Sequence, residues 1–285
     1  MKSSWRPTSY LYFSFFSFLL VTNTCPVFAT SDIDKLENSI NYAFANYLGT
    51  GVYTATDRNV QIYHLPFTKD ISNEPEANPF IFFRLPFTIG FLEFTPQEIL
   101  DSGLPDRLET ITFVPGIGLH YQVSNQWQLT PFIDIGFGHD FATNQTALVY
   151  GSGIKSRFTF DYTDYVIELH NELLYAGNSV KTDSKTNDFS RFETGLNFSY
   201  PLPFKLWDRK TALSLYAINF NYFNSLDFIR FTEGKIQVRT QNEIGITFDT
   251  TPDMAISKVE FSRVGLAYRT GNGVNVIRLV FGMPF

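Results

Sequence analysis

The sequence has 285 residues, of which 44% are hydrophobic and 17% aromatic, and its formal net charge at pH 7 is −6. A surface of that sign repels a phosphate backbone, so nucleic acid is excluded as a partner. Beyond the first 29 residues no window approaches the unbroken apolar run of about 18 residues that marks a membrane helix. The apolar residues are instead dispersed by alternation along the chain.

Residues 1–29 carry the three-part pattern of an export signal. Lys2 and Arg6 precede an apolar run over about residues 10–21, and Ala29 ends a small-residue cleavage site. This run is shorter than the roughly 20 residues that a membrane helix needs, which favours a removable signal peptide. Its removal would leave 20 basic against 28 acidic side chains in the mature chain, a net charge of about −8.

Residues 30–49 are predicted to form an amphipathic helix. Ser31 stands at the N-cap position and Gly49 supplies a C-terminal stop. At about 1.5 Å per residue, the seventeen residues 32–48 that show the helical period give roughly 25 Å, enough to thread a barrel lumen or to lie along its rim. We prefer a plug inside the lumen, while an interfacial helix lying on the membrane stays open. Apolar side chains recur at spacings of three or four, which defines the plug face as Ile33, Leu36, Ile40, Phe44 and Tyr47.

From residue 50 onward the apolar pattern has a period of two. In the segment 127–141, for example, Ile133 and Ile135 alternate with Asp134 and Gly136. This pattern is typical of a strand with one side against lipid and the other against a polar lumen. The candidate strands are 60–67, 80–94, 110–123, 127–141, 146–160, 165–176, 189–202, 211–223, 236–249, 256–269 and 274–285.

These candidates number eleven, whereas single-chain bacterial barrels have an even number of strands. We place the missing strand at a split near 226–232, and we expect Pro66 and Pro86 at a strand end or a bulge. The segment 177–188 is the best surface loop, on the outside of the cell if Phe285 ends at the periplasmic side. The predicted fold class is all-β: residues 50–285 form one transmembrane antiparallel β-barrel of about 12 strands, with the N-terminal helix in or against its lumen.

Several segments resemble a known family. They are residues 49–54 (GTGVYT), 56–59 (TDRN) and 64–67 (HLPF), and the hairpin from 113–116 (FVPG) to 131–136 (PFIDIG). With the export signal and the helix, they resemble the translocator half of autotransporters, and more specifically the solitary outer-membrane autotransporter-type β-barrels of vibrios. The resemblance implies an integral outer-membrane barrel that is structural or passes small polar solutes. About thirty mature residues before the strands leave nothing of domain size to export as a passenger.

One row of titratable side chains is predicted to face the lumen. Glu168, His170 and Glu172 lie on one face of a strand at i, i+2 and i+4, and Glu193 and Arg278 are further lumen-lining candidates. Such a row could bind a metal or relay a proton. We prefer a hydrated wall whose carboxylates pair with cross-barrel arginines, because structural ion pairs are at least as common a cause of such clusters. The candidate arginines are Arg157, Arg191 and Arg278.

We assign no catalytic, cofactor-binding or metal-binding residue, and we expect no enzyme. His139 and Asp140 are adjacent, but neighbours in a strand point to opposite faces and do not form a dyad. Two other function classes stay open: an outer-membrane lipid-modifying enzyme centred on His139 or His170, and a surface-binding protein acting through the loop 178–188. Alternate glycines such as Gly151 and Gly153 are expected to make room for the helix.

The end of the sequence predicts how the barrel is assembled. Ile277, Leu279, Phe281 and Phe285 fall on one face of the last candidate strand, and Phe285 is the expected C-terminal insertion signal. The expected partners are outer-membrane lipid and the barrel-insertion machinery, which would bind the C-terminal strand. The protein is expected to be a monomer of the outer membrane that carries no cofactor.

Overall fold

A computed structural model of the protein describes residues 46–47, 49–55, 58–71, 78–92, 110–141, 144–180, 186–231, 234–256 and 259–285. All of them belong to one compact unit, Glu37–Phe285. The predicted signal peptide and the helix residues Ile33, Leu36, Ile40 and Phe44 lie outside the described residues, whereas Tyr47 is described and helical. In the described part of the chain no helix is long and apolar enough to span a bilayer.

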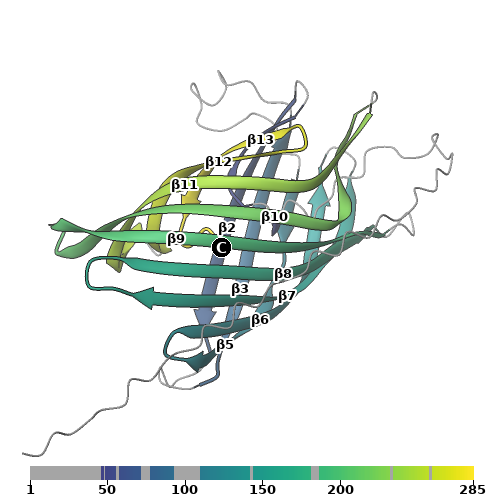
Figure 1. The fold of residues 1–285 in the computed structure, drawn as a ribbon. Coiled ribbons are helices and arrows are strands. Elements are labelled where there is room, and N and C mark those ends of the chain that lie inside the picture. Colours follow the sequence, from purple (N-terminus) through teal and green to yellow (C-terminus); the bar gives the residue numbers. More distant parts are fainter. Residues whose placement is uncertain are drawn as a thin grey trace, which may run out of the picture. The chain divides into compact units, whose positions relative to one another are not determined.

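The described residues form strand segments joined in one antiparallel sheet (Figure 1). The segments are β1 (Gly51–Ala55), β2 (Arg58–Asp70), β3 (Phe80–Leu92), β4 (Thr110–Phe113), β5 (Gly116–Ser124), β6 (Trp127–Asp140), β7 (Gln145–Asp161), β8 (Val166–Val180), β9 (Thr186–Leu206), β10 (Arg209–Phe231), β11 (Gly234–Ile256), β12 (Val259–Gly271) and β13 (Val274–Phe281).

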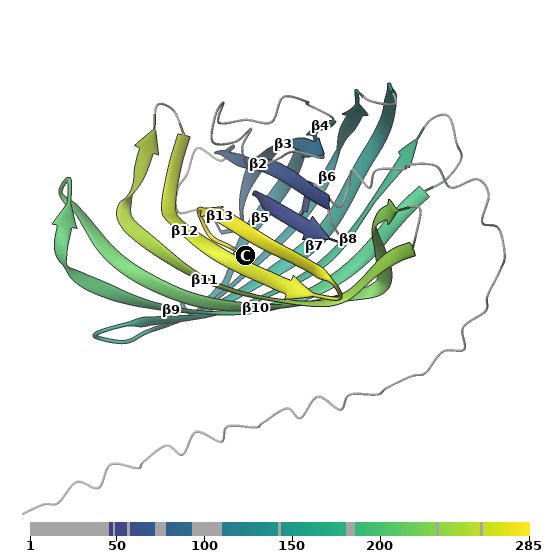
Figure 2. The same ribbon diagram turned by 90° about the horizontal axis from the view of Figure 1, so that it is seen from above.

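The sheet closes on itself. Strand β1 pairs with β2 on one side and with β13 on the other, so that Gly51 lies opposite both Ile62 and Arg278. Figure 2 shows the sheet curving round from β2 to β13. Closure leaves no unpaired edge, which is the condition for strands to cross hydrocarbon.

Segments β4 and β5 occupy a single strand position. Both pair with β3 and with β6, and the two residues between Phe113 and Gly116 face two residues of β6, between Phe137 and Asp134. The register therefore runs unchanged across the interruption. Counted this way, the described residues form a closed barrel of twelve antiparallel strands, as the sequence predicts.

The interruption coincides with a line of prolines. Pro66 of β2 and Pro86 of β3 lie directly opposite each other in the strand interiors, so our expectation of a strand end or bulge was wrong. Because each lacks an N–H, pairing them confines the loss of donors to one position. The carbonyl groups of Pro86 and of Pro115, which lies in the interruption itself, still accept hydrogen bonds. Val114 N donates to Pro86 O at 3.2 Å, and Ile135 N donates to Pro115 O at 2.9 Å.

The missing strand is β1, and the predicted split near 226–232 was wrong. Leu226 pairs with Val238 and Phe231 with Gly234, so β10 continues past a register shift that follows Asn221. Strand β1 has only five residues. That is too few for a period-two pattern to stand out from its surroundings.

The predicted loop 177–188 is mostly strand. Gly177 to Val180 continue β8, Thr186 begins β9, and Ser179 lies opposite Thr186. Strand β9 has 21 residues, about twice the 9–11 that a tilted membrane strand needs, so the hairpin stays paired beyond the bilayer. Counting back from β13 through an unsplit β10, the β8–β9 connection lies at the end of the barrel opposite to Phe281.

The two faces of the sheet differ as the alternation predicts. On β6, Ile133 and Phe137 are 63% and 64% exposed on the outer face, while Asp134 between them is 1% exposed on the inner face. The inner face is not uniformly polar, however. Toward the β12–β13 turn it carries a buried apolar wall, to which Val60, Ala147, Val149, Ala176, Val274 and Val276 belong.

Replacing Ile133 by arginine should lower the free energy of unfolding from a bilayer by about 2–4 kcal/mol, the cost of a cationic side chain at the bilayer midplane. Ile133 lies halfway along β6 on the outer face. Urea titration of the barrel in lipid vesicles, followed by tryptophan fluorescence, measures the change.

Tyr121→Arg is the matched control, because Tyr121 is also exposed but lies close to the β5–β6 turn. There the same charge should cost only about 0–1 kcal/mol. Equal losses for the two variants would contradict a lipid-facing belt centred on the middle of β6.

Candidate functional site

The inner face of the barrel brings charged side chains from neighbouring strands together. The five predicted lumen-lining residues all lie on this face, with exposures of 4–8%. They belong to three separate clusters rather than to one row. The five are Glu168, His170 and Glu172 on β8, Glu193 on β9 and Arg278 on β13.

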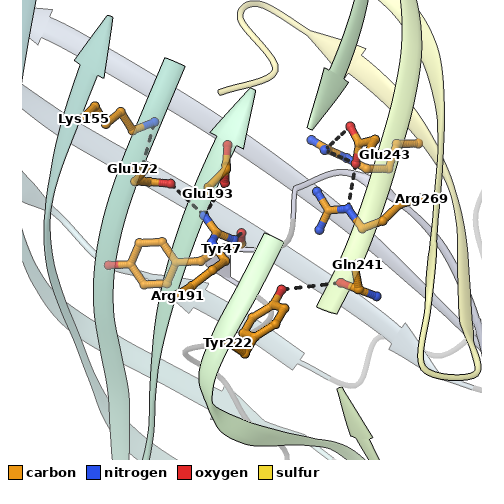
Figure 3. A network of polar contacts seen from close by, with 10 residues as sticks. Tyr47, Lys155, Glu172, Arg191, Glu193, Tyr222, Gln241, Glu243 and Arg269 are labelled. Atoms are coloured by element: carbon orange, nitrogen blue, oxygen red, sulfur yellow. Dashed lines mark hydrogen bonds and ion pairs between the residues drawn. The ribbon is translucent and has the colours of Figure 1, made fainter. Parts of the chain in front are cut away.

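The first cluster is built around Arg191 of β9 (Figure 3). Its Nη2 lies 2.7 Å from Glu172 Oε2 and 2.9 Å from Glu193 Oε2, and Lys155 Nζ lies 3.8 Å from Glu172 Oε1. Two cations thus balance two carboxylates. The predicted pairing of Arg191 is present, whereas Arg157 bonds to the amide of Gln128.

The second cluster joins two arginines to one carboxylate. Arg269 Nε lies 2.6 Å from Glu243 Oε2, Arg278 Nη1 lies 2.7 Å from Glu243 Oε1, and Tyr216 donates to Glu243 at 2.9 Å. Glu243 is 1% exposed, and Figure 3 shows it beside Arg269. Arg278 is one of the predicted lumen-lining residues, whereas Glu243 and Arg269 were not predicted, although both occupy inward positions of the neighbouring strands β11 and β12.

The third cluster contains the predicted pair Glu168 and His170. Glu168 Oε2 accepts hydrogen bonds from Asn197 at 2.9 Å and from Arg263 at 3.2 Å, and it lies 3.9 Å from His170 Nε2. Arg263 also lies 3.6 Å from Asp249. Glu168 is therefore paired with an arginine of a distant strand, as in the preferred interpretation of the row.

Tyr47, the last residue of the predicted plug face, lies inside the barrel. Its hydroxyl donates to Asp134 Oδ2 at 2.9 Å, and its carbonyl accepts from Arg191 at 3.2 Å. Burial and the neighbouring Asp134 carboxylate raise the pKa of Tyr47, so the phenol stays protonated and donates. A Cβ at Gly151 would overlap the Tyr47 ring, so this glycine makes room for it, as expected for the glycine rows.

Residues 282–285 leave the sheet and turn into the lumen. Gly282 has a φ of +75°, a conformation that favours glycine, and β13 ends just before it at Phe281. The Phe285 ring stacks on His170 with centroids 4.0 Å apart, and a Cβ at Gly195 would overlap it. Figure 2 shows the C-terminus within the ring of strands.

The expectation that Phe285 shares the outer face with Phe281 was therefore wrong. An alternating pattern gives the face of a residue only while the strand continues, and the strand stops four residues earlier. The aromatic residue that β13 places on the outer face is Phe281, which is 45% exposed. Recognition of Phe285 by the insertion machinery stays a prediction.

A cavity of about 700 Å³ lies in the lumen on the Phe281 side of these clusters. Its wall combines cationic side chains, carboxylates and the turned-in chain end. The charged members of the wall are Asp70, Arg84, Lys155, Arg157, Glu172, Arg191, Glu193, Arg269 and Arg278, and the chain end contributes residues 282–285.

The remaining histidines take part in local contacts. His139 bonds to Thr146 at 3.0 Å and is half-buried, whereas Asp140 beside it is buried on the other face, so the two do not act together. His64 contacts Thr88 at 2.9 Å, and His120 stacks on Phe82 at 4.3 Å. No group of three or more His, Cys, Asp or Glu side chains in the described ranges is placed to hold a metal ion.

Comparison with known proteins bears on the fold. No protein-family model matches the chain, and no curated protein matches it in sequence. The β domain of the Bordetella autotransporter BrkA is similar in structure, with a TM-score of 0.50 and 11% identity over 81% of this chain and 92% of that chain. LpxR from Salmonella typhimurium gives a TM-score of 0.45 at 10% identity, over 80% of this chain and 90% of that one.

At such low identity the likeness concerns the fold alone, and the weaker match carries no argument. The chain has the fold of an outer-membrane β-barrel, similar to an autotransporter β domain.

Glu243→Gln should lower the free energy of unfolding by about 3–5 kcal/mol, because removing one partner of a buried ion pair leaves its charge uncompensated. Here two buried guanidinium groups, those of Arg269 and Arg278, lose their shared carboxylate. Urea unfolding of the refolded barrel in detergent measures the loss.

Asp188→Asn is the control, since Asp188 is exposed and accepts one hydrogen bond from Tyr175. Its effect should stay within about 0.5 kcal/mol. A loss at Glu243 no larger than that at Asp188 would show that the second cluster does not hold the barrel wall together.

Proposed function

We propose that the protein passes small polar solutes across the outer membrane through a lumen that is occluded in this state. The observation that carries the proposal is the cavity of about 700 Å³ inside a closed barrel, walled by charged side chains of strands on several sides. Small-molecule sites commonly have volumes of roughly 300–1,000 Å³. The cavity therefore suits a small solute and is too small for a folded passenger.

Two segments occlude the path. Tyr47 crosses the lumen to Asp134 and Arg191, and Phe285 lies against His170. Beyond Tyr47 the inner wall is apolar, with Val149 and Val276 almost fully buried. Such a wall suits the apolar face of the predicted helix better than it suits water, which supports a plug over an interfacial helix.

The finer features of the proposal come from the sequence. We take the protein to be exported by a cleavable signal peptide and inserted as a monomer by the barrel-insertion machinery. We further take it to be an autotransporter-like barrel that carries no passenger. The likeness to an autotransporter β domain supports the outer-membrane setting through the fold.

The described residues show no arrangement of side chains that supports either of the two alternative functions. A lipid-modifying enzyme would need a base positioned beside a nucleophile or an activated water. His139 and Asp140 face opposite sides of β6, and His170 is covered by the Phe285 ring. The tip of the proposed binding loop, 181–185, lies outside the described residues.

Liposome swelling tests the proposal. Proteoliposomes with the wild-type barrel should swell slowly in an isotonic arabinose solution, and Phe285→Ala should swell severalfold faster because it removes the ring that lies against His170. Phe137→Ala is the matched control, since it removes a ring from the outer face and should leave the rate unchanged.

Tyr47→Ala provides a second way to open the path. Its ring lies beside Gly151, and its loss should also raise the swelling rate. If correctly folded wild-type, Phe285→Ala and Tyr47→Ala barrels all fail to swell, solute passage is wrong.

A further inference from the structure

We propose that the lumenal cavity binds small oxyanions and so favours anionic over cationic solutes. This inference rests on the proposed function and names the chemical class of its solute. Its basis is an arginine-rich wall whose buried N–H donors are not all satisfied. Six cationic side chains line the cavity together with three side-chain carboxylates, namely Arg84, Lys155, Arg157, Arg191, Arg269 and Arg278 with Asp70, Glu172 and Glu193.

Most of this charge is compensated. With Asp134 and Glu243, which pair with arginines of the wall, the six cations face five side-chain carboxylates, so one positive charge is in excess. Arg84 pairs with Asp134, which lies behind the wall, at 2.8 Å. Lys155 and Arg191 are matched by Glu172 and Glu193. Of the third cluster, His170 lines the cavity, whereas Glu168, Arg263 and Asp249 do not.

The excess charge lies at the second cluster. Arg269 and Arg278 share the single carboxylate of Glu243, so the three side chains carry a net charge of +1. Both arginines line the cavity, and both are buried. Within the described part of the chain, Nη1 of Arg269 and Nε of Arg278 have no hydrogen-bond partner. Buried donors of this kind are costly unless an acceptor reaches them.

A further cation without a carboxylate in ion-pair contact lies on β7, although Asp70 on β2 offsets its charge within the wall. Arg157 donates to the neutral amide of Gln128, and its neighbour on the same face, Lys155, keeps a side chain that is one third exposed. In the closed ring β7 stands six strand positions from β13. Arg157 and Arg278 therefore approach one cavity from opposite walls.

Opposed guanidinium groups, with unpartnered N–H donors on Arg269 and Arg278, favour a particular ligand. The planar fork of arginine matches the oxygen pairs of carboxylate and phosphate groups, and such charge-assisted bonds are about twice as strong as neutral ones. Rings of basic side chains likewise select anions in channels. A small phosphate or carboxylate fits both the volume and the donors.

Phosphate binding to the refolded full barrel in detergent, measured by calorimetry at low ionic strength, tests the inference. Wild-type protein should bind inorganic phosphate saturably. The double variant Lys155→Gln, Arg157→Gln should bind it at least about tenfold more weakly, since each change removes a charged donor. These two residues are chosen because neither lies in the buried Glu243 cluster, so the variant should still fold.

Lys210→Gln is the matched control. Lys210 is exposed beside the β9–β10 turn, and neutralising it changes the net charge by one unit without touching the cavity. Its phosphate affinity should equal that of the wild type. Absence of saturable binding in the wild type, or equal affinities of the wild type and the double variant, would overturn the inference.

Ion selectivity gives an independent readout that separates this inference from the proposed function. In a potassium chloride gradient, bilayers with the Phe285→Ala barrel should show a reversal potential of anion-selective sign. Adding Lys155→Gln and Arg157→Gln to this variant should move the reversal potential toward zero. If the liposomes swell in arabinose but the barrel does not bind phosphate, the anion site is wrong and solute passage stands. If the barrel binds phosphate but the liposomes do not swell, solute passage is wrong and the anion site stands.

Discussion

The structure depends on the pairing of β1 with β13. In hydrocarbon an unpaired backbone N–H or C=O costs several kcal/mol, so a sheet of this size is stable in a membrane only when its first and last strands meet. Five residues of β1 provide that closure, with Gly51 opposite Arg278 and Ala55 opposite Val274. Once the cylinder is closed, each residue has only two environments. Side chains that meet lipid must be apolar, and charged side chains must face the interior.

That interior explains why the charges come in clusters. A lone buried ion would be prohibitively costly, and each carboxylate of the three clusters lies within ion-pair distance of an arginine, often one on a neighbouring strand. The neighbour is close because adjacent strands are separated by only about 4.8 Å. Arg263 reaches farther, from β12 to Glu168 on β8, and so spans the lumen. Rings fill the remaining space where glycines leave room, as Tyr47 does at Gly151 and Phe285 at Gly195.

The sequence predicts the barrel, its strand number and the inward row of β8, because all three follow from a period of two. It does not predict which inward residues meet, since pairing depends on the register between strands. Glu243 and Arg269 were missed for that reason: Glu243 faces Arg269 directly across the β11–β12 ladder. Two further errors, the omission of β1 and the outward placement of Phe285, arose where the pattern is too short. A strand of five residues and a turned-in end of four give the alternation too few repeats to be read.

The two occluding segments are held by different forces, which bears on how the lumen would open. Tyr47 is fixed by a hydrogen bond to a carboxylate and by a guanidinium at its carbonyl. Bonds to charged groups contribute about 1.5–3 kcal/mol each. Phe285 is held by ring contacts with His170 and Tyr216, which contribute about 0.5–1.5 kcal/mol each beyond burial. Moreover, Gly282 turns the chain end away from the end of β13, whereas Tyr47 leads into β1 and the seam of the barrel. Displacing Phe285 leaves every strand pair intact, so the chain end is the part of the plug that can move without weakening the closure on which the fold depends.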